Sequence, residues 1–298
     1  MDADSRLESA RRLLAAGSPR DVATAIERLR DAAALGEAPA SCLLAVLAGI
    51  GIGVARDFGA AIGYLRDAAH AGSAFARDQL AVLSPDGDED IAQVWTAPCE
   101  KRVLSASPRI VAIDGFIPLA ACDWLIARAS SRLSPARVYG ETQKASDPGS
   151  SRTNAAFEFE LFDLDMVVVM VRVRIAATVG APEGALETSQ VFNYQVGQRF
   201  APHHDWLDPS LPAQVADIAR FGQRAVTFLT YLNGDFDGGE TDFPRLGLRH
   251  KGAAGGALYF GNLDAGGAGD PRTVHEGLAP TRGEKWLLSQ WIRNRARV

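Results

Sequence analysis

The sequence is poor in cysteine and has no long apolar run. Its three cysteines, Cys42, Cys99 and Cys122, are odd in number and widely separated, and they lack the spacing of a zinc site. They therefore predict no disulfide framework and favour a reducing compartment. The most apolar run, residues 166–171, is far shorter than a membrane span, and the N-terminal residues lack the apolar core of a signal peptide. We expect a cytoplasmic protein with no membrane partner.

An excess of positive charge is also missing. The chain has 31 Lys and Arg against 36 Asp and Glu, a net charge of −5. This balance, without a basic stripe, argues against a nucleic-acid partner. The chain has 298 residues, of which 47% are hydrophobic and 22% charged. This is the composition of a globular protein, and the length suits one large domain or two smaller ones.

The beginning of the chain contains an internal repeat. The stretch AIERLRDAAALGEAPA (25–40) returns as AIGYLRDAAHAGSAFA (61–76), and the offset is 61 − 25 = 36 residues. Apolar residues recur at helical spacing in both copies. The unit resembles the Sel1-like repeats, relatives of the tetratricopeptide helical hairpins. The resemblance implies a helical repeat domain at residues 1–84 with a protein-binding groove. An alanine-rich bundle that only caps the rest of the chain is the alternative.

The character of the sequence changes after the acidic, turn-rich stretch SPDGDED (84–90). We take residues 85–100 as a linker and residues 101–298 as a second domain. In this domain, β-branched and aromatic runs bounded by glycine predict strands. The predicted strands are 189–196, 225–232, 256–261 and 285–293, and the predicted helices are 119–133 and 163–180. The valines of the second helix would also suit a strand.

Histidine is scarce but concentrated in one place. Two of the five histidines, His203 and His204, are adjacent in RFAPHHDWLDPS (199–210). On an extended segment, residues i and i+2 share a face, so His203 and Asp205 can reach one ion while His204 points away. Among the other histidines, His275 lies just before the last predicted strand. Two histidines and one carboxylate form the facial triad of non-haem Fe(II) oxygenases, which leaves positions open for a co-substrate and dioxygen.

Lys285 lies ten residues after His275, at the start of a predicted strand. A buried lysine needs an anionic partner, and the distal carboxylate of 2-oxoglutarate would provide one. The surrounding patterns are YxxGxxFxxHxD at 194–205, RxxTxLxYLN at 224–233, GGETDF at 238–243 and HxGxxPxxGxKW at 275–286. With these patterns, the chain from about residue 110 onward resembles the prolyl 4-hydroxylase type of Fe(II)/2-oxoglutarate dioxygenase.

The resemblance implies the fold and the cofactors. It implies an α+β chain in which a double-stranded β-helix (jelly roll) with supporting helices follows the helical repeats. The implied iron ligands are His203, Asp205 and His275, and the implied 2-oxoglutarate contacts are Lys285, Tyr194 and Thr241. Ascorbate is the implied reductant. By itself, Tyr194 also reads as a half-buried strand tyrosine, and Thr241 as a turn threonine.

The resemblance also implies which residues face the substrate. These are Arg152, Arg224, Trp291 and Glu187, although Trp291 reads equally well as a core aromatic at a strand end. Asn154 stands where the family has a serine, which suggests a different substrate. Residues 207–222 are a lid, a substrate-recognition segment or surface decoration, and Trp206 closes the mouth of the site or packs beside it.

The implied activity is hydroxylation of an unactivated C–H bond with release of succinate and CO2. We expect the substrate to be a prolyl or other residue of a protein or peptide, recruited by the N-terminal repeats. A free amino acid or another small molecule is the alternative substrate, because fold alone does not decide function. The alternative from a different class is a non-catalytic repeat scaffold. A cupin metal site would leave Lys285 unexplained.

Overall fold

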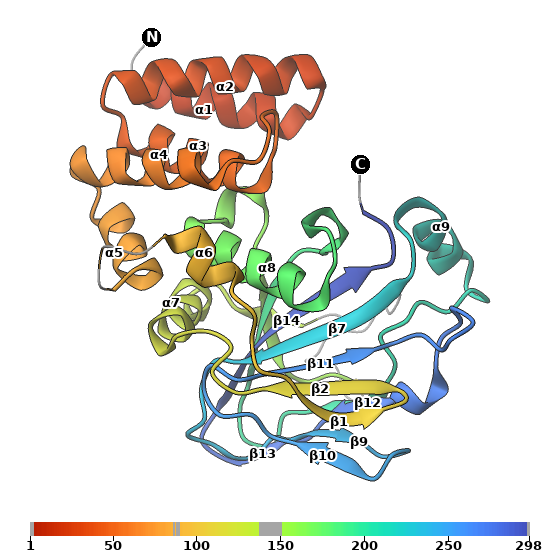
Figure 1. Cartoon of the computed structure of the whole chain (residues 1–298). Coiled ribbons are helices and arrows are strands. Elements are labelled where there is room, and N and C mark those ends of the chain that lie inside the picture. The colour runs from red at the N-terminus through yellow and green to blue at the C-terminus, as the bar shows by residue number, and fades with distance from the viewer. Residues whose placement is uncertain (1–2, 86, 88–89, 137–150, 297–298) are drawn as a thin grey trace. The chain divides into compact units, whose positions relative to one another are not determined.

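The protein forms two compact units (Figure 1). The computed structural model describes residues 3–85, 87, 90–136 and 151–296. The first unit comprises Met1–Ala97 and Glu160–Arg174, and the second comprises Pro98–Phe159 and Ile175–Val298. Each unit therefore consists of two separate stretches of the chain.

The described residues of the first unit are organised as helices. They are α1 (Ala3–Ala16), α2 (Pro19–Ala34), α3 (Ala38–Ile50), α4 (Phe58–His70), α5 (Ala74–Leu83), α6 (Ile91–Thr96), the short 3-10 helix η1 (Leu161–Asp163) and the first part of α8 (Met166–Val179). Side chains cap several N-termini: Ser18 accepts a hydrogen bond from the Asp21 amide at 3.1 Å, and Asp57 from the Ala60 amide at 2.9 Å. These caps satisfy amides that a helix leaves unpaired in its first turn.

The sequence repeat is also a repeat of helix ends and buried positions. Helices α2 and α4 end at Ala34 and His70, and α3 and α5 begin at Ala38 and Ala74. Both differences (70 − 34 and 74 − 38) equal the 36-residue offset of the sequence repeat. Fully buried residues recur at the same offset in the pairs Ala25 and Ala61, Leu29 and Leu65, Ala32 and Ala68, and Ala40 and Ala76. The small alanines let neighbouring helices approach closely.

This division differs from the predicted boundaries of 1–84, 85–100 and 101–298. Helix α6 lies within the predicted linker. It packs in the first unit, where Trp95 is buried and its Nε1 donates a hydrogen bond to the Leu83 carbonyl at 3.0 Å. Residues 160–174 join the first unit, where the Met166 amide donates to Gln79 Oε1 at 2.8 Å. Residues 86, 88 and 89 of the predicted linker lie outside the described residues.

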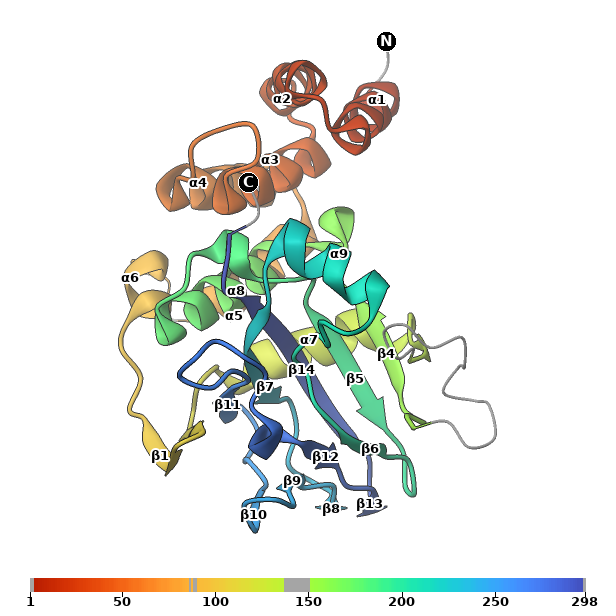
Figure 2. The same ribbon diagram turned by 90° about the vertical axis from the view of Figure 1, so that its right-hand side faces the viewer.

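The second unit is built on antiparallel sheets (Figures 1 and 2). The eight-stranded sheet has the order β1 (Arg102–Ala106), β2 (Arg109–Ile113), β11 (Ala257–Gly261), β7 (Arg224–Tyr231), β14 (Lys285–Arg293), β5 (Gln190–Tyr194), β4 (Ala155–Glu158), β3 (Ser134–Pro135). The four-stranded sheet has the order β10 (Leu248–His250), β9 (Thr241–Phe243), β12 (His275–Gly277), β6 (Phe200–His203). A third sheet pairs β13 (Pro280–Arg282) with β8 (Asp237–Gly238).

Helices accompany these sheets, and an aromatic core joins them. The helices are α7 (Leu119–Ser130), the end of α8, α9 (Pro212–Phe221) and the 3-10 helices η2 (Glu183–Ala185) and η3 (Pro271–Thr273). The core cluster takes Tyr231 and Phe260 from the eight-stranded sheet, and Phe200 and Phe243 from the four-stranded one. Two sheets that bury their inner faces against each other form a sandwich with one core. The mixed helix-and-sheet class is therefore confirmed.

The predicted elements of the second domain are present. The four predicted strands are β5, β7, β11 and β14, and the two predicted helices are α7 and α8. Helix α9, within residues 207–222, was not predicted. Among the described residues, the helices are all too short or too polar to span a bilayer.

Candidate metal and co-substrate site

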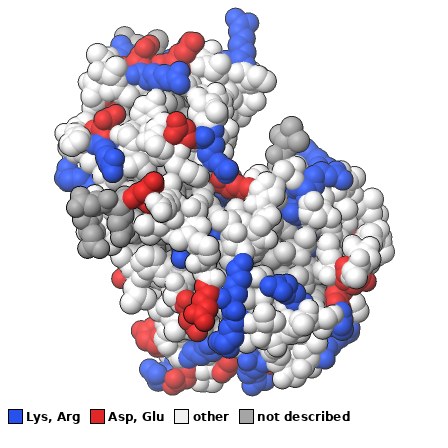
Figure 3. Space-filling view, viewed as in Figure 1, with Lys and Arg blue, Asp and Glu red and all other residues white. Residues whose placement is uncertain are grey.

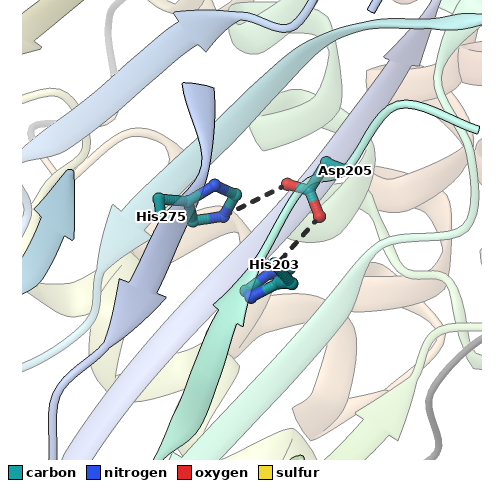
Figure 4. A group of neighbouring side chains, drawn as sticks. All are labelled: His203, Asp205 and His275. Carbon is teal, nitrogen blue, oxygen red and sulfur yellow. Dashed lines mark ion pairs between the residues drawn. The ribbon is translucent and has the colours of Figure 1, made fainter. Parts of the chain in front are cut away.

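Three side chains of metal-ligand type converge in the second unit (Figure 4). His203 ends β6 and lies opposite His275, the first residue of β12, and Asp205 lies two residues after the end of β6. His203 Nε2 is 3.6 Å from Asp205 Oδ1, and His275 Nε2 is 3.5 Å from Asp205 Oδ2. The three candidate ligand atoms lie within 4.8 Å of one another, so one ion can contact all three. The structure thus brings together the three residues that the sequence predicted.

Backbone carbonyls orient both imidazoles. His203 Nδ1 lies 2.8 Å from the Ala201 carbonyl, and His275 Nδ1 lies 3.0 Å from the Thr273 carbonyl. A carbonyl only accepts, so Nδ1 donates in each ring and a neutral ring keeps its lone pair on Nε2. Burial and, to a smaller extent, the neighbouring His275 lower the pKa of His203 to about 3. Both Nε2 atoms are therefore oriented for metal binding.

Asp205 supplies the anionic ligand. Burial alone would raise the pKa of this carboxyl group, but His275, His203 and the Thr227 hydroxyl together bring it to about 2. Thr227 Oγ1 donates to Asp205 Oδ2 at 2.7 Å. Two neutral imidazoles and one carboxylate form the donor set that suits a non-haem Fe(II) ion. The residues present therefore fit this metal.

His204 takes no part in the cluster. Its ring stacks on Trp206 with the centroids 3.7 Å apart, and its Nδ1 lies 3.0 Å from the Trp206 carbonyl. The side chain is exposed. The alternation expected of an extended segment therefore separates His204 from the candidate ligands.

An inner cavity extends from the three candidate ligands to Lys285. Tyr194, Thr241 and Lys285 line it, and it holds about 380 Å³ of space, its mouth included. Lys285 is 1% exposed and donates from Nζ to the Gly239 carbonyl at 2.8 Å. Burial lowers the pKa of this lysine to about 8 despite the nearby Glu240. An ammonium group so deeply buried needs an anionic ligand.

Two hydroxyl groups complete the inner cavity. Thr241 Oγ1 lies 3.1 Å from the Tyr231 hydroxyl, and the Tyr194 ring lies 5.2 Å from Lys285 Nζ. Burial raises the pKa of Tyr194, so its phenol stays protonated and remains a hydrogen-bond donor. A cation and hydroxyl groups at one end, with metal ligands at the other, suit a 2-oxo dicarboxylic acid. The cavity therefore fits 2-oxoglutarate.

An outer cavity lies on the other side of the candidate ligands. It holds about 1260 Å³ of space, its mouth included, and its lining contains Arg152, Arg224, Trp206 and Trp291. Four residues line both cavities: Phe200, His203, Asp205 and Trp291. His203 and Asp205 of the candidate metal site therefore face both the smaller cavity that reaches Lys285 and the larger one.

The predicted substrate residue Arg152 is buried in the wall of the outer cavity. Its guanidinium carbon lies 4.1 Å from the Phe192 ring centroid and 4.6 Å from that of Phe200. Its Nε donates to Asn154 Oδ1 at 2.7 Å. Asn154 therefore orients the guanidinium group of Arg152.

Glu187 does not line either cavity, unlike Arg224 and Trp291. It accepts two hydrogen bonds from Arg224, both at 2.8 Å, and another from Arg293. The Arg224 guanidinium in turn lies 3.8 Å from the Trp291 ring. The structure therefore does not place Glu187 in contact with a substrate in either cavity, because two arginines bind its carboxylate.

Several neighbours of the site were not predicted as functional residues. Thr227 contacts Asp205, and Tyr231 contacts Thr241. Arg293 binds both Glu187 and Asp217. A signal was available, because Thr227 and Tyr231 have the same parity on β7, and Arg293 has the same parity as Lys285 on β14. Residues of equal parity share a face of a strand.

Helix α9 lies beside the outer cavity. Gln214 of this helix and Leu207 before it contribute to the cavity lining. The Gln223 side chain accepts a hydrogen bond from the Leu207 backbone amide and donates one to the Leu207 carbonyl, each at 2.7 Å. Arg293 binds Asp217 of the helix at 2.8 Å. Polar contacts therefore attach this segment, whose helix has no buried residue.

The charged side chains on one face of the molecule are mixed in sign. On the face shown in Figure 3, basic and acidic side chains lie next to one another on both the helical unit and the β unit. This distribution matches the small net charge of −5.

Comparison with known proteins agrees with this geometry. Residues 189–293 match the 2OG-Fe(II) oxygenase superfamily. Prolyl 4-hydroxylase 1 of Arabidopsis thaliana is 29% identical over 223 residues, which cover 70% of this chain and 77% of that protein. Probable prolyl 4-hydroxylase 6 of the same plant is 29% identical over 211 residues, 65% of this chain and 72% of the relative.

A solved structure is also similar. The viral collagen prolyl hydroxylase of Paramecium Bursaria Chlorella virus-1, in its 2OG complex, is 26% identical with a TM-score of 0.48, and the match covers 61% of this chain and 94% of that one. The family match covers the strands that carry His203, Asp205, His275 and Lys285. Residues 189–293 therefore form a 2OG-Fe(II) oxygenase domain, in a chain similar to prolyl 4-hydroxylases.

Proposed function

We propose that the protein is an Fe(II)- and 2-oxoglutarate-dependent dioxygenase that hydroxylates a prolyl residue of a protein or peptide. The observation that carries the proposal is the cluster of His203, Asp205 and His275 in a cavity that reaches the buried Lys285, beside a larger cavity whose lining includes Arg152 and Trp206. The named relatives are prolyl 4-hydroxylases. We also assign the two facing antiparallel sheets to a double-stranded β-helix.

The residues divide the work between the two cavities. His203, Asp205 and His275 would hold Fe(II), and Lys285, Tyr194 and Thr241 would hold 2-oxoglutarate in the inner cavity. With dioxygen, the iron and its co-substrate supply the oxidising power for C–H hydroxylation. Lys285 neutralises the distal carboxylate, and the two hydroxyl groups fix its orientation. Ascorbate as the reductant and a cytoplasmic location remain predictions.

The outer cavity would receive the substrate. Arg152 presents a buried cation beside aromatic rings, and Trp291 forms a wall that both cavities share. A cation and aromatic faces suit a peptide carbonyl and a pyrrolidine ring. The segment 207–222 would act as the recognition segment, since Gln214 lies in the lining.

The helical repeats would recruit the protein substrate. A cavity in the first unit, between α2, α3 and α4, is lined by Arg30 and Tyr64 among apolar residues. Substituting Arg30→Glu and Tyr64→Ala should raise KM for a protein substrate and leave KM for a short proline-containing peptide unchanged. Equal effects on both substrates would contradict recruitment by the repeats.

The experiment that tests the function has two stages. Fe(II) and then 2-oxoglutarate are added to the protein without oxygen, and the metal-to-ligand charge-transfer band is recorded. Oxygen and proline-rich peptides are then added, and succinate and hydroxyproline are measured, with free proline and other free amino acids as parallel substrates. A band followed by peptide hydroxylation supports the proposal, turnover of free amino acids alone supports the small-molecule alternative, and the absence of a band supports the scaffold.

A further inference from the structure

A chain of two buried side chains leads from the candidate ligand Asp205 away from both cavities. Thr227 Oγ1 lies 2.7 Å from Asp205 Oδ2, and Asn262 Nδ2 lies 2.9 Å from the same Thr227 oxygen. Thr227 is 1% exposed and Asn262 is 0% exposed. Thr227 comes from β7, and Asn262 follows β11 directly. The chain therefore connects a candidate metal ligand to two central strands.

The direction of these hydrogen bonds is fixed by chemistry. An ionised carboxylate only accepts, so the single proton of the Thr227 hydroxyl must point to Asp205. The lone pairs of the same hydroxyl then face Asn262, which must present its NH₂ group. If the Asn262 amide were flipped, two acceptors would face each other. The order of donation is therefore Asn262 to Thr227 to Asp205.

This orientation leaves one group of Asn262 unsatisfied. Among the described residues, no donor lies within hydrogen-bond distance of Asn262 Oδ1. A buried acceptor without a partner destabilises a fold and calls for a functional explanation. The backbone of Asn262 is fully used, because its amide donates to the Ala225 carbonyl at 2.8 Å and its carbonyl accepts from Asp270 at 2.9 Å. The side chain is thus held in place independently of its own hydrogen bond.

We propose that Thr227 and Asn262 are positioning residues for the metal: Asn262 aligns the Thr227 hydroxyl, which fixes the rotation of the Asp205 carboxylate toward His203 and His275. The inference rests on the proposed function, since it assumes that these three residues bind Fe(II). The Thr227 hydroxyl donates directly to the Asp205 side chain. Partners of this kind typically change metal affinity or activity about 10- to 100-fold when removed.

The test measures metal affinity and does not depend on turnover. The metal-free full-length protein is titrated anaerobically with Co(II), a spectroscopic probe, and with Fe(II) by calorimetry. Thr227→Val keeps the shape and removes the donor, and we expect it to weaken binding about 10- to 100-fold. Thr227→Ser should restore the wild-type affinity. Thermal unfolding of each metal-free variant identifies any loss of fold.

A second residue on the same strand provides the matched control. Thr230 is also fully buried in β7, its hydroxyl has no partner among the described residues, and it lines neither of the two cavities. Thr230→Val should therefore leave metal affinity unchanged. Asn262→Leu keeps the backbone hydrogen bonds of residue 262. It tests the hydrogen-bonded chain from Asn262 through Thr227 to Asp205, here called the relay, even where Thr227→Val does not fold. The double variant Thr227→Val/Asn262→Leu should bind no more weakly than Thr227→Val alone, because Asn262 acts through Thr227.

The outcomes separate the relay from the function. Tight binding by wild type with equally tight binding by Thr227→Val and Asn262→Leu overturns the relay and leaves the metal site intact. Additive losses in the double variant also overturn it, because they indicate two independent packing defects. Wild-type protein that binds neither Co(II) nor Fe(II) overturns the proposed function, and the relay with it.

Discussion

Lys285 and Tyr194 lie directly opposite each other in the antiparallel pair of β14 and β5, with Lys285 Nζ 5.2 Å from the tyrosine ring. They are distant in sequence, and a single strand register brings them to the same end of the inner cavity. That register also determines how far the cationic end of the cavity lies from the candidate metal ligands.

Lys285→Met should weaken 2-oxoglutarate binding and leave the fold intact. Loss of a hydrogen bond to a charged partner costs about 1.5–3 kcal/mol, which is roughly 10- to 100-fold in Kd. Removing the buried ammonium group also removes the free-energy cost of its desolvation, so the unfolding temperature should not fall. Anaerobic titration of the charge-transfer band measures Kd, and Lys251→Met, at an exposed lysine, is the control. Equal affinities in wild type and Lys285→Met would place the distal carboxylate elsewhere.

The affinity for 2-oxoglutarate should depend on pH through Lys285. Burial lowers the pKa of this lysine to about 8 from its ordinary 10.5. The folded protein without co-substrate therefore loses this proton before the unfolded chain does, so this group makes the fold more stable as pH rises from about 8 to 10.5. Binding needs the charged form, so Kd should be constant below pH 8 and rise about tenfold per unit above it.

Calorimetric titration between pH 7 and 9.5 checks this dependence. In Lys285→Met, the rise of Kd with pH should disappear, although every other titrating group of the protein is still present. A wild-type Kd that stays constant over the whole interval would contradict a Lys285 pKa near 8 as the source of the pH dependence.

Glu187→Ala should destabilise the second unit strongly. The carboxylate binds Arg224 and Arg293, whose side chains are 9% and 2% exposed. Breaking a buried ion pair on one side costs about 3–5 kcal/mol, because the remaining charges stay buried. Urea unfolding measures the loss. The control is Asp237→Ala, which breaks a solvent-exposed pair with Arg282 and should leave the free energy of unfolding nearly unchanged. Similar losses in both variants would contradict the buried network.

The two adjacent histidines should behave differently. His203→Ala removes a candidate ligand and should abolish tight metal binding. His204→Ala should keep metal affinity, because the His204 ring stacks on Trp206 outside the cluster. Loss of that stack should instead change peptide KM, since both residues line the outer cavity. Anaerobic Co(II) titration compares the two variants, and weak metal binding by His204→Ala would place it among the ligands.

Local periodicity was sufficient to place His203 and Asp205 on one face, whereas His275 was predicted as the third ligand through the family resemblance, and the strands β6 and β12 were not predicted. His203 and Asp205 share a parity, and the register of β6 with β12 then places His275 opposite His203. The role of Glu187 was not predictable in this way. Its partners Arg224 and Arg293 lie 37 and 106 residues away, and no local pattern shows whether a carboxylate faces a cavity or two arginines.

Helix α9 and the domain boundary were missed for other physical reasons. The residue before α9, Leu211, offers no capping side chain, and the helix buries no residue, so Pro212 at its first position was the one start signal and no buried face supported it. Residues 166–171 are apolar throughout. Such a run predicts burial but not the unit in which it is buried, and here it packs in the first unit, where Val169 faces Gly49.

The alternation of β14 limits how this enzyme can change during evolution. Lys285, Leu287, Ser289 and Trp291 are the residues of this strand that line the inner cavity, and they have equal parity. An insertion of one residue within the strand would turn every later side chain to the opposite face, replacing Trp291 at the cavity by its neighbours. New substrate specificity is therefore reachable through single substitutions at odd-numbered positions, or through the loops that end the strand, but not through a change in its length. The residues that hold the co-substrate and those that meet the substrate are inherited together.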